Sequence, residues 1–175
     1  MLACKNKYGL ENKCMGIEIE RKFLMKSDEW KVHVTETHVI KQGYLQSGMD
    51  TTQQSSVRIR ISNKQANINV KSAELSAVRQ EFEYEIPLHD AEQMLRTLCG
   101  GVVIEKTRFY VPYESHLWEI DIFSGENTGL QMAEVELGSL DEHFEKPDWL
   151  GPEVSHDERY YNNYLIKNPY HKWRT

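Results

Sequence analysis

Hydrophobic and charged residues alternate along residues 17–23, which read Ile-Glu-Ile-Glu-Arg-Lys-Phe. Successive side chains of a β-strand point to opposite faces, so Glu18, Glu20 and Lys22 would share one face. The pattern therefore predicts a strand with one ionic face and one apolar face. Comparable alternation predicts seven further strands, at residues 38–45, 56–61, 67–71, 78–87, 103–110, 117–123 and 132–137.

Helical spacing is confined to a few segments. Apolar residues recur at helical intervals over residues 90–99, and two glycines follow, which predicts a helix with one apolar face. A short helix is expected to begin at Ser27, and a capping box at residues 155–158 predicts a helix through about Leu165. The chain beyond Leu140 is otherwise expected to be helical and irregular, with a frayed basic tail at the C-terminus.

About eight strands joined by short turns, without regular alternation of strand and helix, indicate an α+β protein built on an antiparallel sheet or barrel. Two arrangements fit the alternation. In one, an open sheet packs its apolar face on helices and exposes a salt-bridged ionic face, which is where charge usually lies. In the other, the sheet closes into a barrel, with apolar residues outward beneath the helices and ionic residues lining a wet lumen.

Charges of one sign segregate by strand, which favours the closed arrangement. The acidic pairs are Glu18/Glu20, Glu81/Glu83 and Glu134/Glu136, and the basic pairs are Arg58/Arg60 and Lys106/Arg108. Neighbouring carboxylates repel unless a cation lies among them, and oxygen ligands suit Mg²⁺ or Mn²⁺ rather than Zn²⁺. Paired bases attract a polyanion. A divalent metal beside a basic wall is what binding of a polyphosphate requires.

The composition narrows the class of protein. The chain of 175 residues fits one domain, expected over residues 15–175, with residues 1–14 as a polar leader. A formal net charge of −6 argues against general nucleic-acid binding, which needs a basic face. No apolar run is long enough to cross a bilayer, so no membrane partner is expected. Three cysteines without C-x-x-C spacing, and no secretory signal, indicate a cytoplasmic protein.

The segment Glu18-x-Glu20-x-Lys22 resembles the ExExK signature of the CYTH superfamily, also called triphosphate tunnel metalloenzymes. Further residues follow in the order of that family: Arg58-x-Arg60, Lys71, Arg79-x-Glu81-x-Glu83, Lys106-x-Arg108, Asp121, Glu134-x-Glu136, Tyr160 and Asn162. The chain looks most like the short bacterial inorganic tripolyphosphatases. The resemblance implies a closed eight-stranded antiparallel β-barrel, with a charged interior and helices packed outside. It also implies Mg²⁺ or Mn²⁺ as cofactor and a triphosphate-containing substrate.

The resemblance implies roles for individual residues. The expected metal ligands are Glu18, Glu20, Asp121, Glu134 and Glu136. The expected substrate-binding residues are Lys22, Arg58, Arg60, Lys71, Arg79, Lys106 and Arg108. Catalytic roles are expected for Glu81, Glu83, Lys22 and Arg60, with Glu81 orienting or deprotonating the attacking water. Glu85 and Glu119 are expected to be rim charges. Tyr160 and Asn162 are expected to fix the terminal helix.

The function that follows from the resemblance is metal-dependent hydrolysis of inorganic tripolyphosphate inside the tunnel. A class IV type adenylyl cyclase, or a nucleoside or thiamine triphosphatase, is an alternative on the same fold. A non-catalytic polyphosphate-binding module is an alternative of another class. In each case the expected partner is a small triphosphate-containing molecule, and a homodimer is left open.

Overall fold

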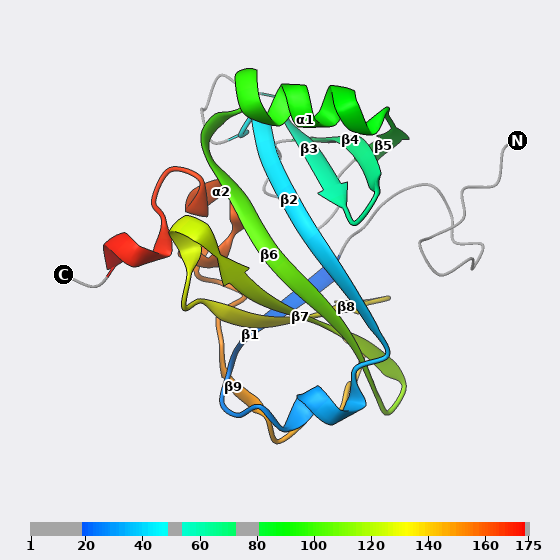
Figure 1. The fold of residues 1–175 in the computed structure, drawn as a ribbon. Helices are drawn as coiled ribbons and strands as arrows, with labels where there is room; N and C mark the ends of the chain where they lie inside the picture. The colour runs from blue at the N-terminus through cyan, green and yellow to red at the C-terminus, as the bar shows by residue number, and fades with distance from the viewer. Residues whose placement is uncertain (1–18, 49–53, 73–80, 174–175) are drawn as a thin grey trace, which may run out of the picture.

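The computed structural model describes residues 19–48, 54–72 and 81–173 (Figure 1). Its nine strands are β1 (Ile19–Met25), β2 (Glu36–Gln46), β3 (Ser55–Ser62), β4 (Gln65–Ser72), β5 (Glu81–Glu85), β6 (Gly100–Tyr113), β7 (His116–Ser124), β8 (Gln131–Leu137) and β9 (Leu150–Glu153). The α-helices are α1 (Leu88–Thr97) and α2 (Asn162–Leu165), and short 3-10 turns span Glu29–His33, Gly125–Asn127, Glu158–Tyr160 and Tyr170–Trp173. None of these helices has the length and apolar character that a membrane span needs.

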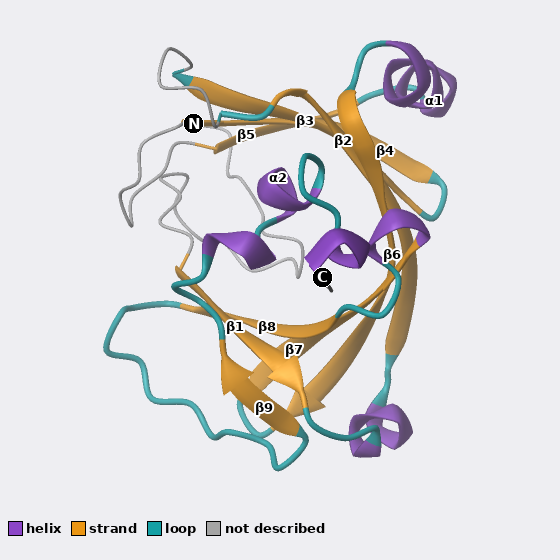
Figure 2. Ribbon diagram, turned by 90° about the vertical axis from the view of Figure 1, so that its left-hand side faces the viewer, coloured by secondary structure: helices purple, strands orange, loops and turns teal. Residues whose placement is uncertain are grey.

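All nine strands belong to one antiparallel sheet, in the order β5-β4-β3-β2-β6-β7-β8-β1-β9. Figure 2 shows this sheet curving around α2 and the C-terminal turns, and we call the face turned toward them the inner face. The predicted antiparallel architecture is confirmed. Closure into a barrel is not seen, because no backbone pairing between described residues joins β5 to β1 or β9.

The ninth strand was not predicted. β9 pairs with β1, placing Glu153 opposite Phe23 and Leu150 opposite Met25. It is only four residues long and contains Gly151 and Pro152, which are both poor strand formers. The expectation of a helical and irregular chain beyond Leu140 is therefore wrong at this point.

Helix α1 covers the outer face of β3 and β4, as its apolar stripe predicted. Ala91 and Leu95 are buried there against Ile59 on β3. Gly43 on β2 allows this close approach, because a Cβ atom at that position would lie 3.0 Å from the Leu95 side chain. The apolar face of the helix was thus predicted from the sequence, whereas the strands that it covers are known from the structure.

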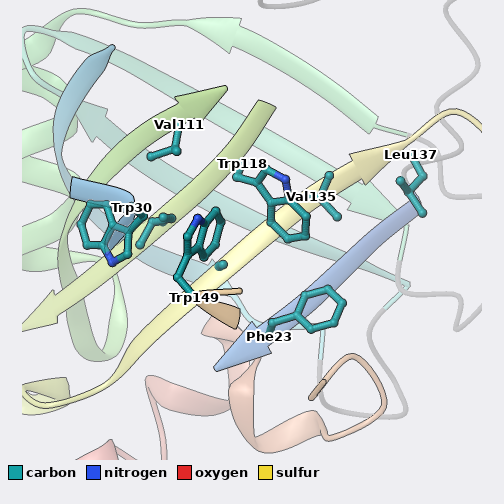
Figure 3. Packing of buried hydrophobic residues seen from close by; sticks show 9 residues of the cluster. Phe23, Trp30, Val111, Trp118, Val135, Leu137 and Trp149 are labelled. Atoms are coloured by element: carbon teal, nitrogen blue, oxygen red, sulfur yellow. The ribbon is translucent and has the colours of Figure 1, made fainter. Parts of the chain in front are cut away.

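A second outer core lies over β1, β6, β7 and β8, and it is dominated by aromatic residues (Figure 3). The rings of Trp118 and Trp149 pack edge to face with centroids 5.4 Å apart, and Phe23 contacts Trp118 at 5.8 Å. Trp30 comes from the segment expected to form a helix at Ser27, which is a 3-10 turn instead. These rings give the sheet an apolar support outside the charged face.

One end of the inner face is apolar and is covered by the C-terminal segment. Leu165 and Ile166 are buried there against Tyr44 of β2 and neighbouring residues of β6, β7 and β8. The continuous helix expected up to Leu165 is wrong, because a 3-10 turn and the short α2 replace it. The tail is ordered rather than frayed as far as Trp173, whose ring lies 5.2 Å from that of Tyr160.

Candidate active site

The inner face carries the charged residues predicted for the site. The register places Lys22 of β1 opposite Glu134 of β8, and Arg108 of β6 opposite Asp121 of β7. Directly opposite residues of neighbouring strands project from the same face. The other half of the inner face presents Arg58, Arg60, Asn69, Lys71, Glu81 and Glu83, from β3, β4 and β5.

A buried ionic network links β1, β6, β7 and β8. Lys22 Nζ lies 2.5 Å from Glu134 Oε1, and Arg108 Nη2 donates to Glu134 Oε2 at 2.7 Å. Arg108 Nε and Nη2 also donate to the two oxygens of Asp121, at 2.8 and 2.6 Å. Lys106 Nζ reaches Asp121 Oδ2 at 2.5 Å. Each of these charges therefore has a partner of opposite sign.

Glu119 belongs to this network, which corrects its expected place at the rim. Its residue is 8% exposed, and its carboxylate accepts a hydrogen bond from Arg108 Nη1. The signal was present in the sequence, because Glu119 is two residues from Asp121 and strand alternation places both on one face. Glu85, the other expected rim charge, lies on β5, where every residue is exposed.

The pKa values follow from burial and pairing. Burial opposes ionisation of Glu134, but Lys22 and Arg108 hold its pKa well below the usual range. Burial likewise opposes the charge on Lys22, yet Glu134 and Glu20 raise its pKa. At Lys106 burial dominates and lowers the pKa to about 8 despite the attraction of the neighbouring carboxylate. Lys22 and Glu134 therefore persist as a charged pair at neutral pH.

Arg58 and Arg60 differ from Arg108, because no carboxylate in the described ranges lies within ion-pair distance of either guanidinium. The Nε atom of each is buried and has no hydrogen-bond partner among the described residues. Burial, Arg58 and Arg108 together lower the pKa of Arg60 to about 10. Glu83 and Glu119 attract Arg60 from a distance, but this attraction does not offset those effects. The inner face thus contains two adjacent arginines that form no ion pair with the described residues.

The expected catalytic acids lie on the edge strand β5. Glu83 accepts a hydrogen bond from Asn69 Nδ2 at 3.2 Å, and Glu81 accepts from the same amide. Lys71 Nζ lies 3.4 Å from Glu81 Oε2. The structure thus brings Glu81, Glu83 and Lys71 together with Asn69, which the charge pattern missed because its side chain is neutral. Arg79, expected beside them, lies outside the described residues.

The expected metal ligands are only partly grouped. Glu20 and Glu136 lie opposite each other on β1 and β8, and Glu136 is exposed. Both oxygens of Asp121 accept hydrogen bonds from basic side chains, and Glu134 is similarly engaged. In the part of the chain that the structure describes, no three His, Cys, Asp or Glu side chains form a group suited to a metal. Glu18 lies outside that part.

The C-terminal segment supports Lys22 from the side opposite the strands. The ring of Tyr161 lies 5.3 Å from Lys22 Nζ, and its hydroxyl donates to the carbonyl oxygen of Ser155 at 2.8 Å. Ser155 Oγ in turn accepts from the backbone N–H of Lys22 at 2.9 Å. Tyr160, by contrast, packs edge to face against Trp173 of the C-terminal segment. Sequence reasoning missed Tyr161, although it adjoins the recognised Tyr160.

Comparisons with known proteins identify the family of this chain. The chain matches the CYTH domain family over residues 16–161. It is 42% identical over 160 residues to an inorganic triphosphatase of Acetivibrio thermocellus, covering 91% of this chain and 99% of the relative. It is 35% identical over 153 residues to an inorganic triphosphatase of Nitrosomonas europaea, covering 85% and 95%. The predicted family resemblance is confirmed.

Several solved structures resemble the fold of this chain. A crystal structure of an inorganic triphosphatase has a TM-score of 0.63 and 31% identity, covering 88% of this chain and 97% of that chain. A putative adenylate cyclase from Bacillus halodurans has a TM-score of 0.54 at 19% identity, covering 73% and 83%. The second likeness concerns the fold alone.

Proposed function

This chain belongs to the CYTH domain family, and on that premise we propose that it is an inorganic triphosphatase. It would hydrolyse a phosphoanhydride bond of tripolyphosphate. Two relatives named as inorganic triphosphatases share 42% and 35% identity with it. These similarities extend over 91% and 85% of the chain, and the family match over residues 16–161 includes the strands that carry the inner-face charges.

The observation that supports this function best is the pair of arginines without a carboxylate partner. Arg58 and Arg60 each have a buried Nε atom that no described residue satisfies. An unsatisfied buried donor costs about 1–3 kcal/mol. A chain of phosphates would supply acceptor oxygens and opposite charge, in a geometry that the planar guanidinium group matches. Lys71 and Arg79 are proposed as further contacts of the same substrate.

We assign the divalent cation, Mg²⁺ or Mn²⁺, to the acidic side of the inner face. Glu20 and Glu136 fit this assignment, because they are oxygen donors that face each other across β1 and β8. Glu18 and Glu134 are proposed to complete the donor set, and at Glu134 the cation would compete with Lys22 and Arg108, which bind its two oxygens. Asp121 lies further from this group, because the register pairs it with Met132, four residues before Glu136 on β8. When bound, the cation supplies charge neutralisation at the phosphate oxygens.

The residues of the chain then have distinct tasks. In the proposed reaction, water attacks the terminal phosphorus and the bridging P–O bond breaks, so that pyrophosphate leaves and orthophosphate forms. Arg58 and Arg60 hold the phosphate chain in line for this attack. Glu81 or Glu83, oriented by Asn69, accepts the proton of the attacking water. The site therefore acts mainly through positioning and charge.

The basic residues of the buried network stabilise the charge that develops on the leaving group. Lys22, Lys106 and Arg108 are held in place by carboxylates, so they need little reorganisation when the substrate changes charge. Asp121 is the carboxylate that orients two of them. Its function in this scheme is to position cations.

Closure of the sheet into an eight-stranded barrel is part of the same proposal. Lys106 and Arg108 are only 2% and 6% exposed although they lie on an ionic sheet face. An open, solvated face would leave them accessible, so their burial supports an enclosed site. A homodimer and a cytoplasmic location remain predictions from the sequence.

A phosphate-release panel tests the proposed function. The substrates are tripolyphosphate, ATP, thiamine triphosphate and pyrophosphate, each with Mg²⁺, with Mn²⁺ and with a chelator. We expect release of phosphate from tripolyphosphate that depends on the metal. Preference for a nucleotide or thiamine triphosphate would support another triphosphatase, and pyrophosphate release from ATP would support a cyclase. Tripolyphosphate binding without turnover under either metal would support a non-catalytic module.

A further inference from the structure

Arg60 on the inner face lies between two residues with amide side chains, one on each neighbouring strand. The register places Gln42 of β2 and Asn67 of β4 opposite Arg60. Gln42 is 0% exposed, and neither its Nε2 nor its Oε1 atom has a hydrogen-bond partner among the described residues. Asn67 Oδ1 is buried and unsatisfied in the same way. These neighbouring residues therefore combine one cation that lacks an ion-pair partner among the described residues with several unsatisfied polar atoms.

A structural role does not account for Gln42. Its cross-strand neighbour on β6 is Ile104, and Ile40 precedes it on the same face of β2, and both are buried. An apolar residue would therefore fit at position 42. Each buried unsatisfied polar atom carries an unfavourable free energy of about 1–3 kcal/mol. An amide at this position accordingly lowers stability unless something outside the described residues bonds to it.

The position of Gln42 indicates what could bond to it. Strand β2 lies between the two basic strands of the sheet, β3 and β6. Gln42 is directly opposite Arg60, and Lys106 is its diagonal neighbour, because the register pairs Lys106 with Ile40. Both of these cations are proposed to contact the phosphate chain. A group between them would contact the same phosphoryl group.

We propose that Gln42 is a further substrate contact, whose Nε2 donates to the phosphoryl oxygen held by Arg60 and whose Oε1 accepts from a water molecule bound beside that oxygen. The inference rests on the proposed function and assigns a new residue to it. An amide suits both tasks because it contains a donor and an acceptor in one rigid group. A lysine at this position could not accept, and it would add a like charge beside Arg58 and Arg60. A glutamate could not donate while ionised.

The test compares Gln42→Met and Gln42→Glu with the matched control Gln65→Met. Gln65 lies on β4 and is exposed, so the same substitution there should change nothing. Affinity is measured by calorimetric titration with tripolyphosphate in the presence of a chelator, which is independent of turnover. Steady-state hydrolysis with Mg²⁺ and the thermal unfolding midpoint are measured on the same samples.

We expect Gln42→Met to weaken tripolyphosphate binding about tenfold and to lower kcat/KM at least as much. Its unfolding midpoint should equal or exceed that of the wild type, because two unsatisfied polar atoms are removed. Gln42→Glu should bind tripolyphosphate still more weakly, since its carboxylate repels the phosphate oxygens. This variant should remain folded, because Arg60 lies opposite position 42 and can pair with the new carboxylate. Wild-type affinity and turnover in Gln42→Met would overturn the assignment. If Gln42→Met is poorly folded, wild-type affinity for tripolyphosphate in Gln42→Glu would overturn the assignment instead.

The proposed function and this inference can fail separately. A wild-type protein that binds tripolyphosphate but releases no phosphate contradicts the triphosphatase proposal. In that case the ratio of affinities between wild type and Gln42→Met still decides whether Gln42 contacts the phosphate chain. A wild-type protein that does not bind tripolyphosphate overturns both.

Discussion

Replacing Arg60 or Arg108 by methionine should change the free energy of unfolding in opposite directions, although both arginines lie on the inner face. Arg108 donates hydrogen bonds to Glu119, Asp121 and Glu134, and its side chain is 7% exposed. Arg108→Met would leave these buried carboxylates short of a cation. Loss of one partner from a buried pair costs about 3–5 kcal/mol. At about 2–4 °C per kcal/mol for this chain length, the unfolding midpoint should fall by about 6–20 °C.

Arg60 lacks such partners. Burial, Arg58 and Arg108 lower its pKa from 12.5 to about 10, so folding disfavours its charged form at pH 7. At about 1.4 kcal/mol per pKa unit this corresponds to about 3 kcal/mol. The side chain is only half-buried, so solvent screening reduces the gain expected from Arg60→Met to about 1 kcal/mol. The unfolding midpoint should then rise by about 2–4 °C.

Differential scanning calorimetry at pH 7, in a chelator and without phosphate, measures both midpoints. Titration with tripolyphosphate on the same samples should show that Arg60→Met binds at least tenfold more weakly despite its higher stability. This combination distinguishes a ligand-binding charge from a structural one. A loss of stability in Arg60→Met as large as that in Arg108→Met would refute the reasoning, because it would mean that Arg60 is compensated within the folded chain.

Three further substitutions test other parts of the structure. Arg21→Met should lower stability by about 1 kcal/mol at pH 7, because bonding to Arg21 depresses the pKa of Glu153 to about 2. This stabilisation is present above the unfolded pKa of about 4.5 and is lost as the pH falls toward 2. Urea titrations should therefore show the free energies of unfolding of wild type and Arg21→Met converging near pH 2. A difference that does not change with pH would contradict this explanation. Gly43→Ala should lower the free energy of unfolding by about 1–3 kcal/mol, because the new Cβ would lie 2.9 Å from the Cβ of Cys99. The control Gly100→Ala should leave the unfolding midpoint unchanged, because no atom lies within 4 Å of its new Cβ. Glu136→Gln should weaken Mg²⁺ or Mn²⁺ binding more than metal-free tripolyphosphate binding by calorimetry; equal losses would argue against a ligand role.

The strands could be predicted from the sequence because their alternation is local and has a period of two residues. The register between strands could not, because it depends on pairings between segments far apart in the chain. For this reason the sequence did not show that Glu134 and Asp121 bond to Lys22, Lys106 and Arg108. The same limit applies to β9, which exists because β1 offers a free edge to a short segment with poor strand propensity.

Neutral residues of the site were harder to find than charged ones. Asn69 and Gln42 lie in alternating strands, but a search for charge does not single them out. Their importance appears only when the inner-face neighbours are known, since the side chain of Asn69 bonds to two carboxylates and that of Gln42 bonds to none of the described residues. Tyr161 was missed for a related reason, because its contact with Lys22 is made across the fold.

The two halves of the inner face differ in how far their polar and charged groups are satisfied within the chain. The half built from β1, β6, β7 and β8 contains bases and acids that neutralise each other, so it can remain buried and rigid without a ligand. The other half, together with the neighbouring strand β2, includes Arg58, Arg60 and Gln42, whose unsatisfied atoms lower the stability of the free protein. Apolar clusters on the outer face provide stability away from this region. A polyanion that bonds to the unsatisfied atoms of Arg58, Arg60 and Gln42 therefore gains binding free energy without breaking the ion pairs of the other half. Those ion pairs can stay fixed while the charge of the bound ligand changes.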